Sequence, residues 1–373
     1  MTERDLSKER FPSMGPPGGP PQRECKPMVL AGDTSTPETI PAEMVRSARS
    51  IKELGLPGRS SLLLSPSPSP PYRIFHALLK NRNGMVVSGV HPNRLKEKYG
   101  IEGADFLWIT EYTGASQAHA RPQDLEYEVL GRVISYMKRK RGGVLFLDDI
   151  EYLTAQLGLE TVLRFVKGTS DGASEHGTTF LATLDPFCLS DRELLSISKC
   201  FDTVRPLGES SRLVRSHSRP LPLPATSSLL MASGPEAYRL LGLLSLSREA
   251  ICLTPISPSK LRERYGLARV NFIWLTETST SKEALPPTKL GYEVQREALA
   301  HIRSAERPLI FLDALELIRP FIPFQESLRF VKCVCDACIE HSASVIAAFN
   351  PSAFEKKEAA LLAKRFDIVK WGI

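Results

Sequence analysis

Short apolar runs alternate with amphipathic segments along most of the chain. In the first half, the apolar runs predict strands near residues 61–64, 85–87, 106–109, 144–147 and 178–183. Apolar residues at helical spacing predict helices near residues 72–80, 92–99, 124–138, 158–174 and 192–198. Short apolar strands separated by helices are typical of βαβ units. The pattern therefore predicts a three-layer α/β domain with a mostly parallel sheet between helices.

The same pattern occurs a second time. Residues 106–111 (FLWITE) match residues 272–277 (FIWLTE), and residues 163–167 match residues 328–332 (both LRFVK). The matched positions lie 166 or 165 residues apart, so few insertions separate the copies. A period of this length indicates a duplicated domain, because solenoid repeats are much shorter.

The repeat defines four segments of the chain. We expect the first α/β domain at residues 58–204 and the second at residues 226–373. Residues 205–225 are rich in Arg, Ser and Pro and are predicted to be an exposed linker. Residues 1–57 are rich in Pro, Gly and Ser and are predicted to be a disordered tail, because they bury little apolar surface.

Carboxylates follow several predicted strands in both copies. Ligands of parallel sheets bind beyond the carboxyl ends of the strands, so these side chains are the candidate binding residues. They are Glu111, Asp148, Asp149 and Glu151 in the first copy and Glu277, Asp313 and Glu316 in the second. Such carboxylates are suited to bind Mg²⁺ or polarise water. The alternative is local capping of the following helices, and Asp313 is followed by Ala314, so the second copy lacks the Asp pair.

Several separated motifs carry a resemblance to a known family. They are GVLFLDDIEYL at residues 143–153, LRFV at residues 163–166, and P-x-x-L-R/K-E-x-Y-G at residues 92–100 and 258–266. Over residues 59–204 and 226–373 the chain resembles an archaeal family of domains of unknown function, number 835. That family is similar to the RecA/KaiC type of P-loop ATPase core. The resemblance implies a fold and a lineage but no activity.

The resemblance also implies a phosphate-binding loop after the first strand, with the pattern G-x-x-x-x-G-K-[ST]. Residues 65–71 (SPSPSPP) stand there, with four prolines and neither Gly nor Lys. Proline has no N–H to donate to a phosphate. The second copy has residues 232–237 (ASGPEA), which lack Lys and include an acid. Only the strand-end Asp148 and Asp313 match, so both nucleotide sites are predicted to be degenerate.

Composition and charge limit the possible cellular locations, cofactors and partners. The net charge of +6 is a mild excess over a long chain, and no apolar segment resembles a signal or a membrane span, so we expect a cytoplasmic protein without a membrane partner. Cys333, Cys335, Cys338 and His341 fall within a predicted helix, where packing is favoured over zinc binding. We assign no metal and no cofactor. The linker arginines are not interleaved with aromatic residues, which disfavours nucleic-acid binding.

Three hypotheses of function remain. The leading one is a non-catalytic interaction or signalling module with a protein partner, for which a related ATPase is a candidate. The alternative is residual ATP or GTP binding, or slow hydrolysis, at the strand ends near Asp148. The third is weak nucleic-acid binding through the basic linker. No catalytic residue is assigned, and packing of the two repeats as a pseudo-dimer is a further hypothesis.

Overall fold

The computed structural model describes residues 51–207, 226–231, 234–278, 281–313 and 315–371. In the first repeat, seven strands form one sheet in the order β4-β3-β2-β5-β6-β1-β7, and all neighbours run parallel. The strands are β1 (Ser60–Leu64), β2 (Gly84–Ser88), β3 (Ala104–Ile109), β4 (His119–Ala120), β5 (Val144–Leu147), β6 (Thr179–Leu184) and β7 (Thr203–Pro206). The predicted α/β class is confirmed.

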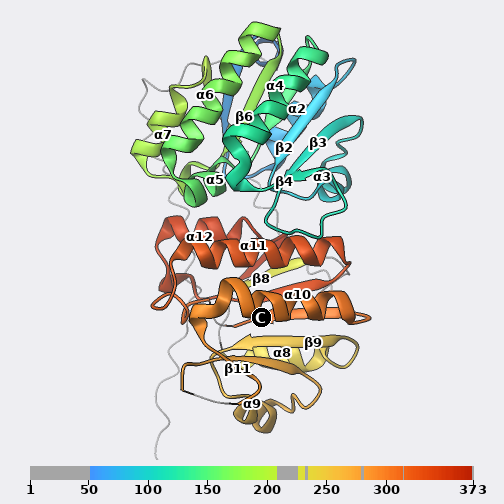
Figure 1. Cartoon of the computed structure of the whole chain (residues 1–373), viewed down its shortest axis with the longest axis vertical. Coiled ribbons are helices and arrows are strands. Elements are labelled where there is room, and N and C mark those ends of the chain that lie inside the picture. Colours follow the sequence, from blue (N-terminus) through green and yellow to red (C-terminus); the bar gives the residue numbers. More distant parts are fainter. Residues whose placement is uncertain (1–50, 208–225, 232–233, 279–280, 314, 372–373) are drawn as a thin grey trace, which may run out of the picture. The chain divides into compact units, whose positions relative to one another are not determined.

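Helices lie on both faces of this sheet (Figure 1). They are α1 (Ile51–Leu54), α2 (Ser69–Leu78), α3 (Pro92–Tyr99), α4 (Leu130–Arg139), α5 (Ile150–Leu157), α6 (Leu159–His176) and α7 (Asp191–Ser198). Crossovers between parallel strands are right-handed, so the reversal of direction after β4 moves the later helices to the opposite face. Accordingly, α2 packs against α3, whereas α6 packs against α4, α5 and α7.

The second repeat has the same topology, with the sheet order β11-β10-β9-β12-β13-β8-β14 and all neighbours parallel. Its strands are β8 (Ser227–Met231), β9 (Glu249–Thr254), β10 (Asn271–Leu275), β11 (Ala284–Leu285), β12 (Pro308–Leu312), β13 (Ser344–Ala348) and β14 (Ile368–Trp371). Its helices are α8 (Pro235–Leu244), α9 (Pro258–Tyr265), α10 (Gln295–Ser304), α11 (Phe324–Glu340) and α12 (Lys356–Ala363). In place of α5, the described residues between 315 and 322 form turns.

Equivalent apolar side chains fill the two cores. In each repeat, one residue each from the first strand, the first long helix, the second strand and the Asp-ended strand meet on one face of the sheet. These are Leu63, Phe75, Val86 and Phe146 in the first repeat and Leu230, Leu241, Cys252 and Phe311 in the second. Burial of such side chains is the main force that stabilises each sheet with its helices.

Two segments differ from the sequence prediction. Leu54 lies within the predicted tail, yet it is fully buried in the first core. Strand β7 continues to Pro206, within the predicted linker, because its backbone pairs with β1. Residues 1–50 and 208–225, the remainder of those two segments, lie outside the described residues. The described residues from 51 to 371 belong to one compact unit that contains both repeats.

Candidate functional site at the strand edge of the first repeat

The predicted strand-end carboxylates of the first repeat lie along one edge of its sheet. Asp148 and Asp149 directly follow β5, Glu151 lies in the first turn of α5, and Glu111 follows β3. Parallel strands place all their carboxyl ends at the same edge, which explains why these residues converge. Asp148, Asp149 and Glu151 are all buried, and their charges act on one another.

Asp148, which matches the Walker-B position, is held by groups of its own repeat. Its Oδ2 accepts a hydrogen bond of 2.7 Å from the hydroxyl of Tyr72, and its Oδ1 accepts one of 2.6 Å from the N–H of Asp149. The Tyr72 hydroxyl also lies 3.2 Å from Ser88 Oγ. Burial raises the pKa of Asp148, although the charge of Lys364 opposes the shift. Both carboxyl oxygens therefore accept a hydrogen bond from the protein.

The second repeat repeats this arrangement. The Tyr238 hydroxyl donates a hydrogen bond to Asp313 and lies 2.8 Å from Thr254 Oγ1. Burial raises the pKa of Asp313 to about 6. The sequence prediction missed Tyr72 and Tyr238. The signal was present, because the two tyrosines are separated by the same 166 positions as the matched motifs.

Asp149 forms a buried ion pair with the second repeat. Its carboxylate accepts two hydrogen bonds from the guanidinium of Arg365, one of them 2.6 Å long. The side chains are 4% and 6% exposed, respectively. Burial alone raises the pKa of Asp149, but the charge and hydrogen bonds of Arg365 outweigh it and lower the pKa to about 2. Asp149 stands at the start of α5, as the capping alternative predicts, but its side chain makes no capping hydrogen bond.

Glu151 forms a second ion pair with the second repeat. Its Oε1 lies 2.8 Å from Nζ of Lys364, and it also accepts a hydrogen bond from the N–H of Asp185. The Glu151 side chain is fully buried and that of Lys364 is 17% exposed. Burial lowers the pKa of Lys364, but the charges of Glu151, Asp148 and Asp149 raise it above its ordinary value. The lysine therefore stays protonated among three carboxyl groups.

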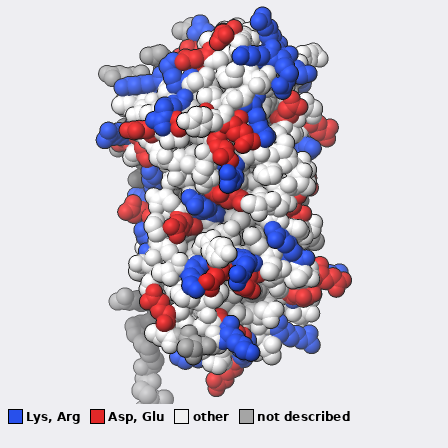
Figure 2. Space-filling view, in the orientation of Figure 1, with Lys and Arg blue, Asp and Glu red and all other residues white. Residues whose placement is uncertain are grey.

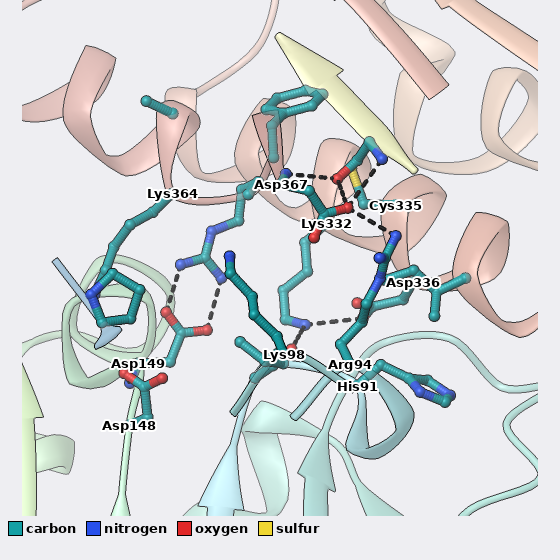
Figure 3. A pocket seen from close by; sticks show the side chains of 18 of the residues that line it. His91, Arg94, Lys98, Asp148, Asp149, Lys332, Cys335, Asp336, Lys364 and Asp367 are labelled. Carbon is teal, nitrogen blue, oxygen red and sulfur yellow. Dashed lines mark hydrogen bonds and ion pairs between the residues drawn. The ribbon is translucent and has the colours of Figure 1, made fainter. Parts of the chain in front are cut away.

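A third contact involves a lysine and an aspartate of α11. Lys332 Nζ donates to the backbone oxygen of Gly89 at 2.7 Å and to Asp336 Oδ2 at 2.8 Å. The same Asp336 oxygen accepts a hydrogen bond of 2.5 Å from Thr110 Oγ1. Figure 3 shows Lys332 and Asp336 facing the ends of the first repeat's strands. This cluster links the strand edge of the first repeat to α11 by groups that are nearly all buried.

Further polar contacts between the repeats surround the buried contacts. His91 Nε2 lies 2.7 Å from Glu340 Oε2, and Arg94 donates to Asp367 at 2.9 Å. The predicted site residue Glu111 lies 3.4 Å from Arg329 Nε. Three of the four predicted carboxylates of the first repeat, Glu111, Asp149 and Glu151, thus pair with basic side chains of the second repeat.

The predicted carboxylates of the second repeat are placed differently. Asp313 accepts from Tyr238, Glu316 accepts a hydrogen bond of 2.5 Å from the N–H of Asn350, and Glu277 is exposed. Burial raises the pKa of Glu316. Within the part of the chain that the structure describes, no hydrogen bond or ion pair joins Glu277, Asp313 or Glu316 to the first repeat.

A cavity of about 400 Å³ lies at the strand edge of the first repeat. Residues of both repeats line it, and its charged groups are mixed (Figure 3). Acidic members include Asp148 and Asp149, and basic members include Arg94, Lys98 and Lys364. The cavity lies where the strand ends converge, which is the usual ligand position in such folds.

The cysteines singled out from the sequence lie along α11, and one of them, Cys335, lines the cavity. Cys333, Cys335 and Cys338 are buried along α11, and burial raises the pKa of Cys333 to about 12. Among the described residues, no group of three or more His, Cys, Asp or Glu side chains is arranged to hold a metal ion. The helices of the described segments include none that is long and apolar enough to cross a membrane.

The fold and the site define a class: tandem α/β domains with parallel sheets, a strand-end aspartate and a proline-containing segment after the first strand. The chain belongs to the family described as protein of unknown function DUF835, whose model matches residues 65–201 and 233–366. No curated protein matches the chain.

Proposed function

We propose that this protein is a non-catalytic interaction module built from two degenerate RecA/KaiC-like domains. In the proposal, the strand edge that holds a nucleotide in related ATPases holds a protein domain instead. The observation that carries it is the pair of buried contacts from Arg365 to Asp149 and from Lys364 to Glu151. Buried charges are stable only when paired, so this edge requires a basic protein surface.

The residues before α2 support the loss of phosphate binding. A phosphate binds at a helix N-terminus through free backbone N–H groups. Helix α2 begins at Ser69, and its next two residues are Pro70 and Pro71, which have no N–H. Ser65 Oγ donates to the backbone oxygen of Ser67, which closes the segment on itself. The order of strand, loop and helix followed by an Asp-ended strand supports the P-loop lineage.

A linker cut tests the docking role. We would insert a specific protease site within residues 208–225, cleave the folded full-length chain, and measure association of the two parts by gel filtration and light scattering. The parts are expected to remain together at micromolar concentration. In the cleaved chain, Arg365→Met leaves Asp149 buried without its partner. The free energy of association is therefore expected to weaken by ~3 kcal/mol, which corresponds to roughly 100-fold weaker binding of the two parts.

The matched control is Arg296→Met on α10, since the Arg296 side chain is 61% exposed. An exposed arginine of this kind contributes little, so the cleaved control is expected to behave as the parent. Separation of the parent parts on cleavage, or equal effects of the two substitutions, would contradict the docking role.

A nucleotide is the second candidate ligand of the same edge. The cavity of about 400 Å³ favours it, because Arg94, Lys98 and Asp148 all line its wall. Calorimetry of the full chain with Mg-ATP and Mg-GTP tests it, with Asp148→Asn as the control. Our proposal expects no heat at millimolar nucleotide; heat that disappears in the variant would establish the nucleotide site.

Nucleic-acid binding has less support. The linker arginines beyond Arg205 lie outside the described residues. Acidic and basic side chains are interspersed over the face shown in Figure 2. A nucleic-acid interface, by contrast, needs a patch of predominantly basic side chains. Affinity for an oligonucleotide that falls steeply with salt would support this third hypothesis. Cytoplasmic location and a related ATPase as partner stay predictions from the sequence.

A further inference from the structure

The contact between the repeats joins two different surfaces. We call them the strand edge, which carries Asp149 and Glu151 in the first repeat, and the helix face, which carries Lys332, Lys364 and Arg365 in the second. Because the chain is a tandem repeat, each surface occurs twice. The contact within one chain uses one surface of each kind, so the strand edge of the second repeat and the helix face of the first are not part of it.

The helix face of the first repeat carries the same residues as the one in use. Lys167 and Asp171 of α6 correspond to Lys332 and Asp336 of α11, and both pairs form an ion pair one helical turn apart. The Lys332 and Asp336 side chains are 2% and 6% exposed, whereas those of Lys167 and Asp171 are 61% and 63% exposed. A set of residues that the contact buries in one repeat is therefore on the surface in the other.

We propose that the helix face of the first repeat binds the strand edge of the second repeat in another copy of this chain. The two copies then join head to tail through the contact that already joins the repeats within one chain. This inference rests on the proposed docking function and adds the identity of the partner.

The charges that would meet are complementary. Lys199 and Glu316 stand at the positions of Lys364 and Glu151, and Lys199 is exposed. Glu277, also exposed, stands at the position of Glu111, whose partner is Arg329. The residue of the first repeat that corresponds to Arg329 is an arginine as well.

That arginine is Arg164, which would bind Glu277 of the second copy in exchange for its present partner Glu126. Asp202 and Lys260 stand at the positions of Asp367 and Arg94, so this pair also keeps its signs. Asp202 and Asp367 each bind the first serine of their own repeat's first strand, which fixes both carboxylates in the same place.

The pair of Asp149 and Arg365 is absent on both sides, whereas the contact of His91 with Glu340 loses only its histidine, because Ser257 stands at the position of His91 and Glu175 at that of Glu340. Cys200 stands at the position of Arg365, and Ala314 stands at the position of Asp149. Replacement of only one partner would leave a buried charge unpaired, at a cost of about 3–5 kcal/mol. Replacement of both leaves a neutral contact, as expected if these two surfaces also meet.

Sedimentation and light scattering of the full-length chain over roughly 1 to 200 µM test the inference. The mass of one chain is 41.4 kDa, and the average mass is expected to rise with concentration beyond that of two chains. Lys199→Glu alters the helix face and Glu277→Arg alters the strand edge. Each is expected to raise the concentration needed for association at least tenfold, while the exposed control Lys80→Glu leaves it unchanged.

The decisive sample is an equimolar mixture of the two variants. Lys199→Glu keeps an intact strand edge and Glu277→Arg keeps an intact helix face, so the mixture is expected to form dimers and no larger species. A parent chain of 41.4 kDa at every concentration, or a mixture that stays monomeric, overturns the inference. If the cleaved repeats still bind each other in that case, only the self-association fails; if they separate, the docking function fails with it.

Discussion

Arg365→Met is expected to destabilise the folded chain because it leaves the carboxylate of Asp149 buried without its counter-ion. The guanidinium of Arg365 makes two hydrogen bonds to Asp149, and both side chains are almost completely buried. Removal of one member of such a pair leaves a buried charge without its counter-ion. The free energy of unfolding is therefore expected to fall by ~3 kcal/mol, near the lower end of the range for buried pairs, because Lys364 and Lys332 also act on Asp149.

The lowered pKa of Asp149 gives a second value for the contribution of this ion pair to the stability of the folded chain. This pKa is lowered from 3.8 to about 2, which amounts to about 2–3 kcal/mol at roughly 1.4 kcal/mol per pKa unit. A depressed carboxyl pKa adds stability that is present above pH 4 and is lost as the pH falls towards 2. In Arg365→Met the pKa of Asp149 rises, so the stability of the variant is expected to change less than that of the parent between pH 4 and pH 2.

Unfolding in guanidinium chloride, followed by tryptophan fluorescence, measures these changes. Trp108 reports on the first repeat and Trp274 on the second. Asp149→Asn and the double variant with Arg365→Met complete a mutant cycle. Asparagine is chosen because Asp149 has a φ of 71°, a conformation that asparagine tolerates. The double variant has no unpaired charge, so it is expected to recover much of the loss, with a coupling energy of ~2–3 kcal/mol.

Two outcomes of the mutant cycle would contradict the role of the Asp149–Arg365 ion pair. If Arg365→Met loses less than ~1 kcal/mol, the pair is worth no more than an exposed one. If the losses of the two single variants add in the double variant, the two side chains do not depend on each other. Either result would refute the argument that Asp149 is kept ionised and buried by Arg365.

Two further predictions use other positions of the same structure. Gly89→Ala would place a Cβ atom 1.9 Å from Asp149 Oδ2, so it is expected to lower the unfolding midpoint strongly, whereas Gly131→Ala meets nothing within 4 Å and should be neutral or stabilising by up to ~1 kcal/mol in thermal unfolding. Asp313→Asn removes a carboxyl whose pKa is raised to about 6, so ionisation costs the parent stability as the pH rises above 3.8. The variant, in which the amide oxygen still accepts from Tyr238, should match the parent at pH 4 and exceed it above pH 6; equal stability of the two at pH 7 would contradict the raised pKa.

Local periodicity determined the fold class because each element shows its own pattern. Residues 144–147 are four consecutive apolar residues, and all four are buried in a central strand. The helix at residues 92–99 ends at Gly100, whose φ of 64° suits glycine. The two-residue strand β4 and strand β7 were missed because neither has an apolar pattern of its own. Only backbone pairing with a neighbouring strand makes them strands.

The sequence by itself also indicated where the candidate site lies. Parallel strands bring their carboxyl ends to one edge, so the positions of Asp148, Asp149 and Glu151 after or near β5 sufficed to place them there. The tertiary structure alone decided what they bind. Lys364 and Arg365 lie 213 and 216 residues further along the chain than Glu151 and Asp149, and no periodic or local pattern connects positions so far apart. The same carboxylates that suit a metal ion also suit a guanidinium or an ammonium group, and only the packing of the second repeat's helices against the first repeat's strand ends selects between them.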